Sequence, residues 1–65
     1  MKVIDLVKKI EDTKLYIEII EIGSYASFGF YNKDTIKQCK FIKSTIAKIN
    51  ANYYDNKRLL EIYIK

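Results

Sequence analysis

Lysine is the residue whose number and spacing in this sequence most clearly predict chemistry, and that chemistry is the binding of anions. Between Asn32 and Asn50 the lysines recur at helical spacing on one arc beside Ser44, and no acid follows Asp34 there. Most wet helix faces mix charge signs, because opposite charges four residues apart stabilise a helix and like charges repel. An unrelieved row of lysines therefore indicates a surface for a negative partner. The predicted row consists of Lys33, Lys37, Lys40 and Lys48.

Phe41 lies at the edge of the predicted lysine arc, away from the apolar stripe of the same helix. An aromatic ring beside lysines can stack on a nucleic-acid base or fill a pocket on a protein. The alternative interpretation is a merely solvated face, because lysines on helices often serve only that purpose. We expect Phe41 and the lysine row to form a partner-binding site.

Side chains suited to catalysis are few. The chain has no histidine, which is the commonest general base and metal ligand. Glu18 and Glu61 form a carboxylate pair in outline, but a small sheet offers little cleft to raise a pKa, and two solvated acids are the simpler interpretation. Cys39 falls on an apolar stripe, where a buried thiol is usually inert. The sequence therefore predicts no enzyme, no catalytic residue, no metal site and no cofactor.

Composition places these residues in one small domain covering residues 1–65. Hydrophobic residues make up 49% of the chain, and a net charge of +4 with a pI near 9.2 permits binding to nucleic acid or acidic proteins. A small domain also needs some net charge for solubility alone. No apolar run approaches the ~20 residues of a membrane span, and the first residues lack a signal-peptide pattern. We expect a cytoplasmic protein with no membrane partner.

Five elements must position these side chains, and each follows from apolar periodicity. In order, they are a helix over 3–12, strands over 14–22 and 25–31, a lysine helix over 32–50 and a strand over 58–64, with a polar turn over 53–57. Asn32 or Asp34 supplies the N-cap of the lysine helix. Gly23 and Ser24 suit a two-residue hairpin turn, because glycine tolerates a positive φ.

This turn fixes the register of the predicted hairpin. The resulting pairs are Ile19 with Phe28, Ile17 with Phe30, Tyr16 with Tyr31, Glu18 with Gly29 and Ile20 with Ser27. One side is then uniformly apolar and aromatic, and the other is mixed. The residues expected at the centre of the core are Ile17, Ile19, Phe28, Phe30, Ile42, Ile46, Leu60 and Ile62.

The element order α-β-β-α-β predicts an α+β fold. The last strand returns beside the first, which gives a three-stranded antiparallel sheet of order 2-1-3 with two helices on one face. The opposite face is left open and too apolar for an ordinary solvated face, so we expect it to bind a partner or a second copy in a homodimer. Tyrosine gives large contact area at low entropy cost. Tyr16, Tyr31 and Tyr63 therefore join the expected partner-binding residues.

The opening segment MKVIDLVKKIED resembles the first helix of very small proteins from phages of low-GC Gram-positive bacteria. Such proteins include anti-CRISPR inhibitors, which are compact α/β chains that block a defence nuclease by occupying a surface. The resemblance implies a non-catalytic inhibitor in the host-cell cytoplasm, with a nucleic-acid-handling protein complex as partner. Many anti-CRISPR proteins are acidic DNA mimics, whereas this chain is basic. It would instead contact an acidic surface of its target, or the guide RNA.

Two functions from different classes remain open at this point. One is a protein-binding inhibitor or adaptor from a mobile element, which acts by steric occupation. The other is a small basic nucleic-acid-binding protein that sets its lysine row against the phosphates of RNA or DNA. The element order is similar to one form of the K-homology RNA-binding domain, but the GXXG loop of that domain is missing. A structural homodimer without a further ligand is the plainest alternative.

Overall fold

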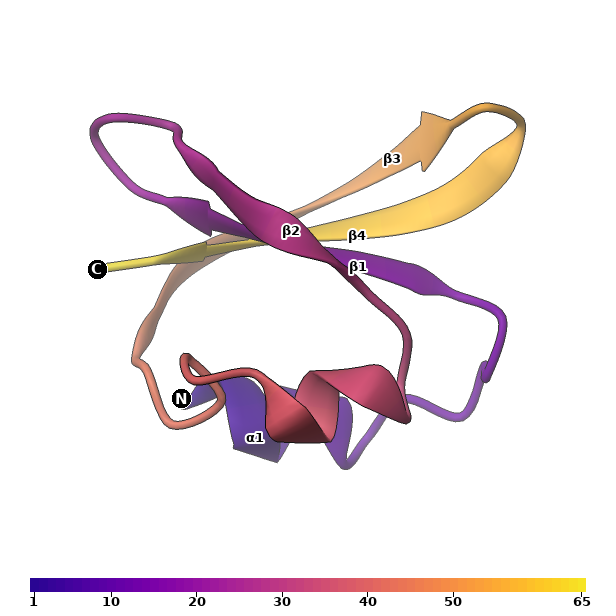
Figure 1. The fold of residues 1–65 in the computed structure, drawn as a ribbon, viewed down its shortest axis with the longest axis horizontal. Coiled ribbons are helices and arrows are strands. Elements are labelled where there is room, and N and C mark those ends of the chain that lie inside the picture. Colours follow the sequence, from indigo (N-terminus) through magenta and orange to yellow (C-terminus); the bar gives the residue numbers. More distant parts are fainter.

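The computed structural model describes residues 1–65 and shows a mostly β protein, with one sheet and a thin layer of short helices on one face (Figure 1). The elements are α1 (Val3–Val7), β1 (Tyr16–Glu21), β2 (Ser27–Tyr31), the 3-10 helix η1 (Thr35–Gln38), β3 (Ile46–Tyr54) and β4 (Lys57–Ile64). The predicted first helix is therefore present but shorter than expected. The predicted second helix is absent.

The sheet has four strands in the order β2-β1-β4-β3, with β1 and β4 parallel at its centre and antiparallel neighbours outside. The prediction of an α+β fold with a three-stranded antiparallel sheet of order 2-1-3 is therefore wrong. The last strand does lie beside the first. A β-hairpin replaces the second helix, however, and its extra strand reverses the chain once more, so that β4 runs parallel to β1.

The segment 32–50 does not form a lysine helix, because only its residues Thr35–Gln38 are helical and residues 46–50 belong to β3. Its apolar residues recur at helical spacing, but several are β-branched, and β-branched side chains lose rotamer freedom in a helix and pack well on a sheet. These are Ile42, Thr45, Ile46 and Ile49. The turn at Asp55 and Asn56 decides the outcome, since both residues are left-handed, with φ of 52° and 62°. Two such residues form the tight connection that joins β3 to β4.

The hairpin of β1 and β2 contains a bulge that the sequence did not predict. Ile20 pairs with Ser27 as expected, but the register then shifts and Glu18 pairs with Phe30. The strand β2 thus places two residues opposite one residue of β1. Gly29 lies at this point with φ of 111°, a conformation that L side chains rarely adopt.

The bulge moves the residues after it to the other side of the sheet. Phe28 packs against the core as predicted, but Phe30 is 49% exposed, so its assignment to the core is wrong. Tyr31 takes the opposite path: it pairs with Ile17 and packs against the core instead of lying on the open face. Its hydroxyl donates a hydrogen bond to the carbonyl oxygen of Phe28 at 3.1 Å.

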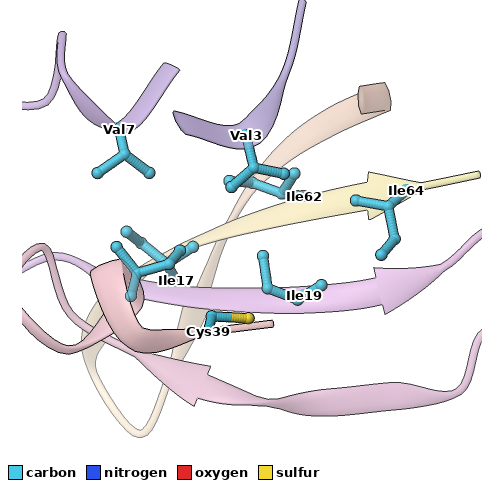
Figure 2. Packing of buried hydrophobic residues seen from close by; sticks show 8 residues of the cluster. Val3, Val7, Ile17, Ile19, Cys39, Ile62 and Ile64 are labelled. Carbon is cyan, nitrogen blue, oxygen red and sulfur yellow. The ribbon is translucent and has the colours of Figure 1, made fainter. Parts of the chain in front are cut away.

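The core lies between the sheet and the helical layer (Figure 2). Its eight buried residues are Val3, Val7, Ile17, Ile19, Ile36, Cys39, Ile62 and Ile64. The predicted positions Ile17, Ile19 and Ile62 are fully buried, and the burial of Cys39 is confirmed. Ile42, Ile46 and Leu60 are only partly buried against this cluster. The core is therefore built mainly from aliphatic residues of β1, β4 and the helical layer.

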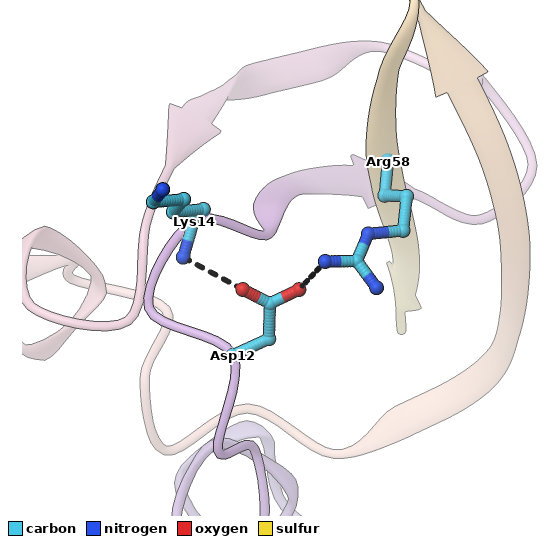
Figure 3. A network of polar contacts seen from close by, with 3 residues as sticks. All are labelled: Asp12, Lys14 and Arg58. Atoms are coloured by element: carbon cyan, nitrogen blue, oxygen red, sulfur yellow. Dashed lines mark hydrogen bonds and ion pairs between the residues drawn. The ribbon is translucent and has the colours of Figure 1, made fainter.

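A polar contact ties the segment between α1 and β1 to the start of β4 (Figure 3). The carboxylate of Asp12 pairs with the guanidinium of Arg58 and also accepts a hydrogen bond from the backbone N–H of Lys14 at 2.9 Å. The Arg58 side chain is 65% exposed. Exposed ion pairs contribute little to stability, so this contact positions the segment more than it stabilises the fold.

Candidate functional site

A groove of about 620 Å³ between α1 and η1 is the most prominent hollow of the molecule. Its lining consists of three aliphatic residues and four lysines, with no acid among them: Ile4, Val7, Ile42, Lys8, Lys33, Lys37 and Lys43. We call it the lysine groove. An apolar floor with cations around it fits a ligand that carries both an apolar group and a negative charge.

Backbone hydrogen bonds bring the two walls of the lysine groove together. The first N–H groups of a helix have no partner within the helix. In α1, the N–H of Val3 donates to the carbonyl of Ser44 at 3.0 Å, and the N–H of Ile4 donates to the carbonyl of Ile42 at 2.8 Å. The segment after η1 is thus held along α1, and Ile4 and Ile42 lie on the same groove.

The second wall is organised by Asn32 at the start of η1. Its side-chain oxygen accepts hydrogen bonds from the backbone N–H groups of Asp34 at 2.9 Å and Thr35 at 2.8 Å. The hydroxyl of Thr35 accepts one in return from the N–H of Asn32 at 2.9 Å. This reciprocal capping satisfies the free donors of a short helix. It also fixes the backbone on which Lys33 and Lys37 stand.

The charge of the chain is concentrated in the layer that contains the lysine groove. We define this helical layer as residues 1–10 and 32–44, which lie together on one side of the sheet (Figure 1). It carries seven lysines against two acids, a formal charge of +5, whereas the remaining residues carry five cations against six acids, a charge of −1. One face of the protein is therefore strongly positive, and a positive face attracts negative partners.

The structure divides the predicted lysine row between the two faces of the protein. Lys33 and Lys37 lie together in the lysine groove. Lys40 lies over the ring of Phe41, with its Nζ 5.1 Å from the ring centroid. Lys48 stands on β3, whose register with Tyr63 puts it on the far side of the sheet. Lys33 and Lys37 were predicted to lie on one long helix, whereas the structure places Lys33 just before η1 and Lys37 within it.

Phe41 was expected to present its ring to a partner, but the ring does not extend into solvent. Its ring stacks on Phe28 with centroids 4.4 Å apart, and both rings pack against the core. Lys8 and Lys43 were missed as groove residues, because they come from segments that only the folded chain brings together. The sequence offered one sign of these two residues, which is the excess of lysine over acid in residues 1–10 and 32–44.

The sheet face opposite the helical layer has no helix over it (Figure 1), as predicted. Ile20 and Leu59 are nevertheless only 6% and 4% exposed. In the parallel register Leu59 lies beside Tyr16, and Ile20 lies beside Tyr63. We call this the aromatic face. Its own tyrosine and phenylalanine rings cover much of the aliphatic surface that a helix would otherwise cover.

The lysines of the aromatic face are engaged with its rings. Lys48 has its Nζ 4.6 Å from the ring centroid of Tyr63 and 5.9 Å from that of Tyr25. Lys57 lies 5.2 Å from the ring centroid of Tyr16 and donates a hydrogen bond to its hydroxyl at 3.3 Å. Such cation–π contacts hold the ammonium groups against the protein. These two lysines are less available to an incoming anion than those of the lysine groove.

A smaller hollow of about 240 Å³ opens at one end of the aromatic face. Its lining residues are Tyr16, Phe30, Tyr54, Asp55 and Lys57. The rings of Phe30 and Tyr54 lie 5.4 Å apart, although they come from the two outer strands. The sheet therefore curls enough for its edges to meet over this face.

The two carboxylates that sequence analysis paired do lie side by side, since Glu18 is opposite Glu61 in the β1–β4 register. Glu61 also accepts a hydrogen bond from the side-chain amide of Asn50 at 2.8 Å. The pKa of Tyr63 lies above its usual value, first because of burial and then because of the nearby carboxylates of Glu61 and Glu18. Neither glutamate stands in a hollow that would hold a substrate.

No group of three or more histidine, cysteine, aspartate or glutamate residues is placed to hold a metal ion. Cys39 is buried, and its sulfur accepts a contact from the N–H of Phe41 at 3.4 Å. No helix of the protein has the length and apolar character of a membrane-spanning segment. The lysine groove and the aromatic face thus remain as the two candidate binding surfaces. Compared with protein families, with curated proteins and with solved structures, the chain matches none.

Proposed function

We propose that this chain is a non-catalytic binding protein that holds an acidic, partly apolar segment of another protein in the lysine groove. The observation that carries the proposal is the lining of that groove, in which four lysines surround three aliphatic residues without an acid. Exposed lysines steer a negative partner toward the surface. The aliphatic floor then gives affinity through burial of an apolar side chain.

The aliphatic floor favours a protein over a nucleic acid as the partner. Single-stranded nucleic acids are bound on aromatic platforms, because every base has a face that stacks on a ring. The groove has no aromatic lining residue, and the nearby ring of Phe41 already stacks on Phe28. The volume of about 620 Å³ accommodates one or two side chains of a partner.

Binding of this kind blocks whatever else would use the acidic surface of the partner. An inhibitor or adaptor that acts by steric occupation needs only this binding and no catalytic step. The resemblance of residues 1–12 to small phage proteins agrees with such a role, in which the target is an acidic surface on a host defence nuclease complex. That target is part of the proposal.

A nucleic-acid partner is the second candidate, and the charge of the helical layer favours it. A layer of charge +5 would bind phosphates without any aromatic contact. Binding would then be independent of sequence and would weaken steeply as salt is added. The aliphatic floor of the groove would play no part in it.

Two probes distinguish the candidates: a short peptide of glutamate and leucine residues, and a single-stranded oligonucleotide of the same charge. We expect the peptide to bind, and its affinity to fall at least tenfold in the variant Lys33→Glu/Lys37→Glu. The matched control Lys14→Glu/Lys65→Glu makes the same change of charge outside the helical layer and should bind almost as the unmodified protein does. Binding of the oligonucleotide but not of the peptide would select the second candidate instead.

A further inference from the structure

We propose that two copies of this chain pair through the free edge of β3, so that their sheets join into one continuous eight-stranded sheet. The site concerned is separate from the lysine groove, because no groove residue belongs to β3. The proposal therefore goes beyond the function proposed above. It does not depend on that function.

The edge of β3 is long and open. This strand has nine residues, and β4 is its one neighbour in the sheet. The N–H of Ile46 donates to the carbonyl of Met1 at 2.9 Å, and the N–H of Tyr53 donates to the side-chain oxygen of Asn52 at 2.8 Å. No further strand lies along the rest of this edge. All of its residues after Ile46 are exposed. Natural proteins usually protect such an edge by keeping it short, by a bulge, or by lysine and proline residues.

The other edge of the sheet is more strongly protected than the edge of β3. The edge strand β2 has five residues and is interrupted by the bulge at Gly29. In β3 the only irregularity lies between Ile46 and Lys48, and the pairing with β4 then continues without a break to Tyr54. Lys48 is the one charged residue of the strand, and the strand has no proline.

β3 also exposes apolar side chains on the same side of the sheet as the core. Ile49 is opposite the buried Ile62, yet it is 51% exposed. Tyr53 points to the same side and is 72% exposed. A hollow of about 300 Å³, lined in part by Ala51 and Tyr53, lies next to them. Further chain placed along this edge would cover these residues.

The sequence of β3 is self-complementary about Ala51. Antiparallel pairing of two identical strands around a two-fold axis must oppose residues that face the same side of the sheet. With Ala51 on the axis, each copy sets Ile49 against Tyr53, Lys48 against Tyr54 and Asn50 against Asn52 of the other copy. The pair of Ile49 and Tyr53 is aliphatic and aromatic, which is favourable across strands. The Lys48 and Asn50 side chains already contact Tyr63 and Glu61 within each copy, so they contribute no like-charge repulsion to the pairing.

The neighbouring registers are poorer. Pairing about Asn50 sets Tyr53 against Ala47 and Ile49 against Ala51, which leaves the large side chains without large partners. Pairing about Asn52 sets Tyr54 against Asn50 and removes Ile49 from contact with Tyr53. Ala51 is also the smallest residue available at the axis, where two identical side chains must meet.

The carboxylates of the aromatic face favour edge pairing over a homodimer through that face. Glu18 and Glu61 lie side by side in the middle of that face. A face-to-face dimer centred there would bring four carboxylates together, and like charges at short range repel. Edge pairing leaves the aromatic faces free and extends them into one surface.

Charge substitutions at the predicted axis test the proposal by sedimentation equilibrium. The unmodified protein should form dimers as its concentration is raised. The dimer should be weak, because the interface is small. Ala51→Glu and Ala51→Lys should each be monomeric, since each puts two like charges on the axis. An equal mixture of the two variants should regain the dimer. A monomeric unmodified protein at millimolar concentration, or a dimer that persists in Ala51→Glu, would overturn the proposal.

A cysteine variant tests the register without relying on the folding of the charged variants. In Ala51→Cys the two thiols would meet across the axis, at the separation of directly opposed residues in antiparallel strands, which a disulfide can span. The natural Cys39 is buried and should not interfere. We expect rapid disulfide-linked dimer formation for Ala51→Cys and little for the control Ala47→Cys in the same strand. Equal rates for the two variants would contradict pairing about Ala51.

Discussion

The backbone N–H of Ile4 donates a hydrogen bond to the carbonyl oxygen of Ile42 at 2.8 Å, which joins the first helix to a segment far along the chain. Both side chains line the lysine groove. Lys8 and Lys43, which follow them in the two segments, line it as well. The groove therefore depends on tertiary structure and on no single helix.

The first prediction concerns the core. Ile62→Ala should lower the free energy of unfolding by about 2–5 kcal/mol, the usual cost of truncating a buried aliphatic side chain. Ile62 is 0% exposed and lies at the centre of the cluster. Urea denaturation followed by circular dichroism would measure the change. The control Ile49→Ala, at a residue that is 51% exposed, should cost far less, and equal costs would contradict the described core.

The second prediction concerns the bulge at Gly29. Gly29→Ala should destabilise the fold by about 1–3 kcal/mol, because an L residue is strained at a positive φ. The φ here is 111°, and the added Cβ would meet only the ring of Tyr31 at 3.7 Å or more, so the cost arises in the backbone. Gly29→Asn should cost less than Gly29→Val, since asparagine tolerates positive φ better. Thermal unfolding of the three variants would check this order.

The third prediction concerns alkaline pH. The neighbouring thiol of Cys39, followed by burial, raises the pKa of Tyr31 above its usual value of 10.0. The folded protein thus holds the phenol proton more tightly than the unfolded chain does. This contribution to stability is complete below pH 10.0 and is lost as the pH rises through the folded-state pKa.

Urea denaturation between pH 8 and about pH 11 would detect this loss. Tyr31→Phe has no titrating group at this position and should lose less stability across that range than the unmodified protein. Tyr53→Phe, at a residue that is 72% exposed, is the control and should behave as the unmodified protein does. An identical pH dependence in Tyr31→Phe and the unmodified protein would contradict the assignment.

Several features of the fold could be predicted from local sequence patterns. The apolar spacing of Val3 and Val7 placed the first helix, and the alternation of Leu60, Ile62 and Ile64 placed β4. In each of these segments the apolar residues fit only one period, that of a helix or that of a strand. The open face of the sheet could be predicted because both expected helices lay on the opposite face.

The segment after Cys39 could not be predicted by periodicity, because its apolar residues fit two periods. Ile42, Ile46 and Ile49 recur at helical spacing, while Ile49 also alternates with Ala51 and Tyr53 as in a strand. The β-branched side chains and the two left-handed turn residues that follow decide for the strand. The lysine groove could not be predicted either, since its lysines come from separate segments.

Amide chemical-shift mapping would show whether the lysine groove binds an acidic, partly apolar protein segment, as we propose. The glutamate–leucine peptide would be titrated into uniformly ¹⁵N-labelled protein, with a peptide of glutamate and serine as control. We expect the control peptide to produce much smaller shifts and the largest shifts to fall on the groove residues Ile4, Lys8, Lys33, Lys37, Ile42 and Lys43. Shifts confined to the aromatic face, or equal shifts with both peptides, would contradict it.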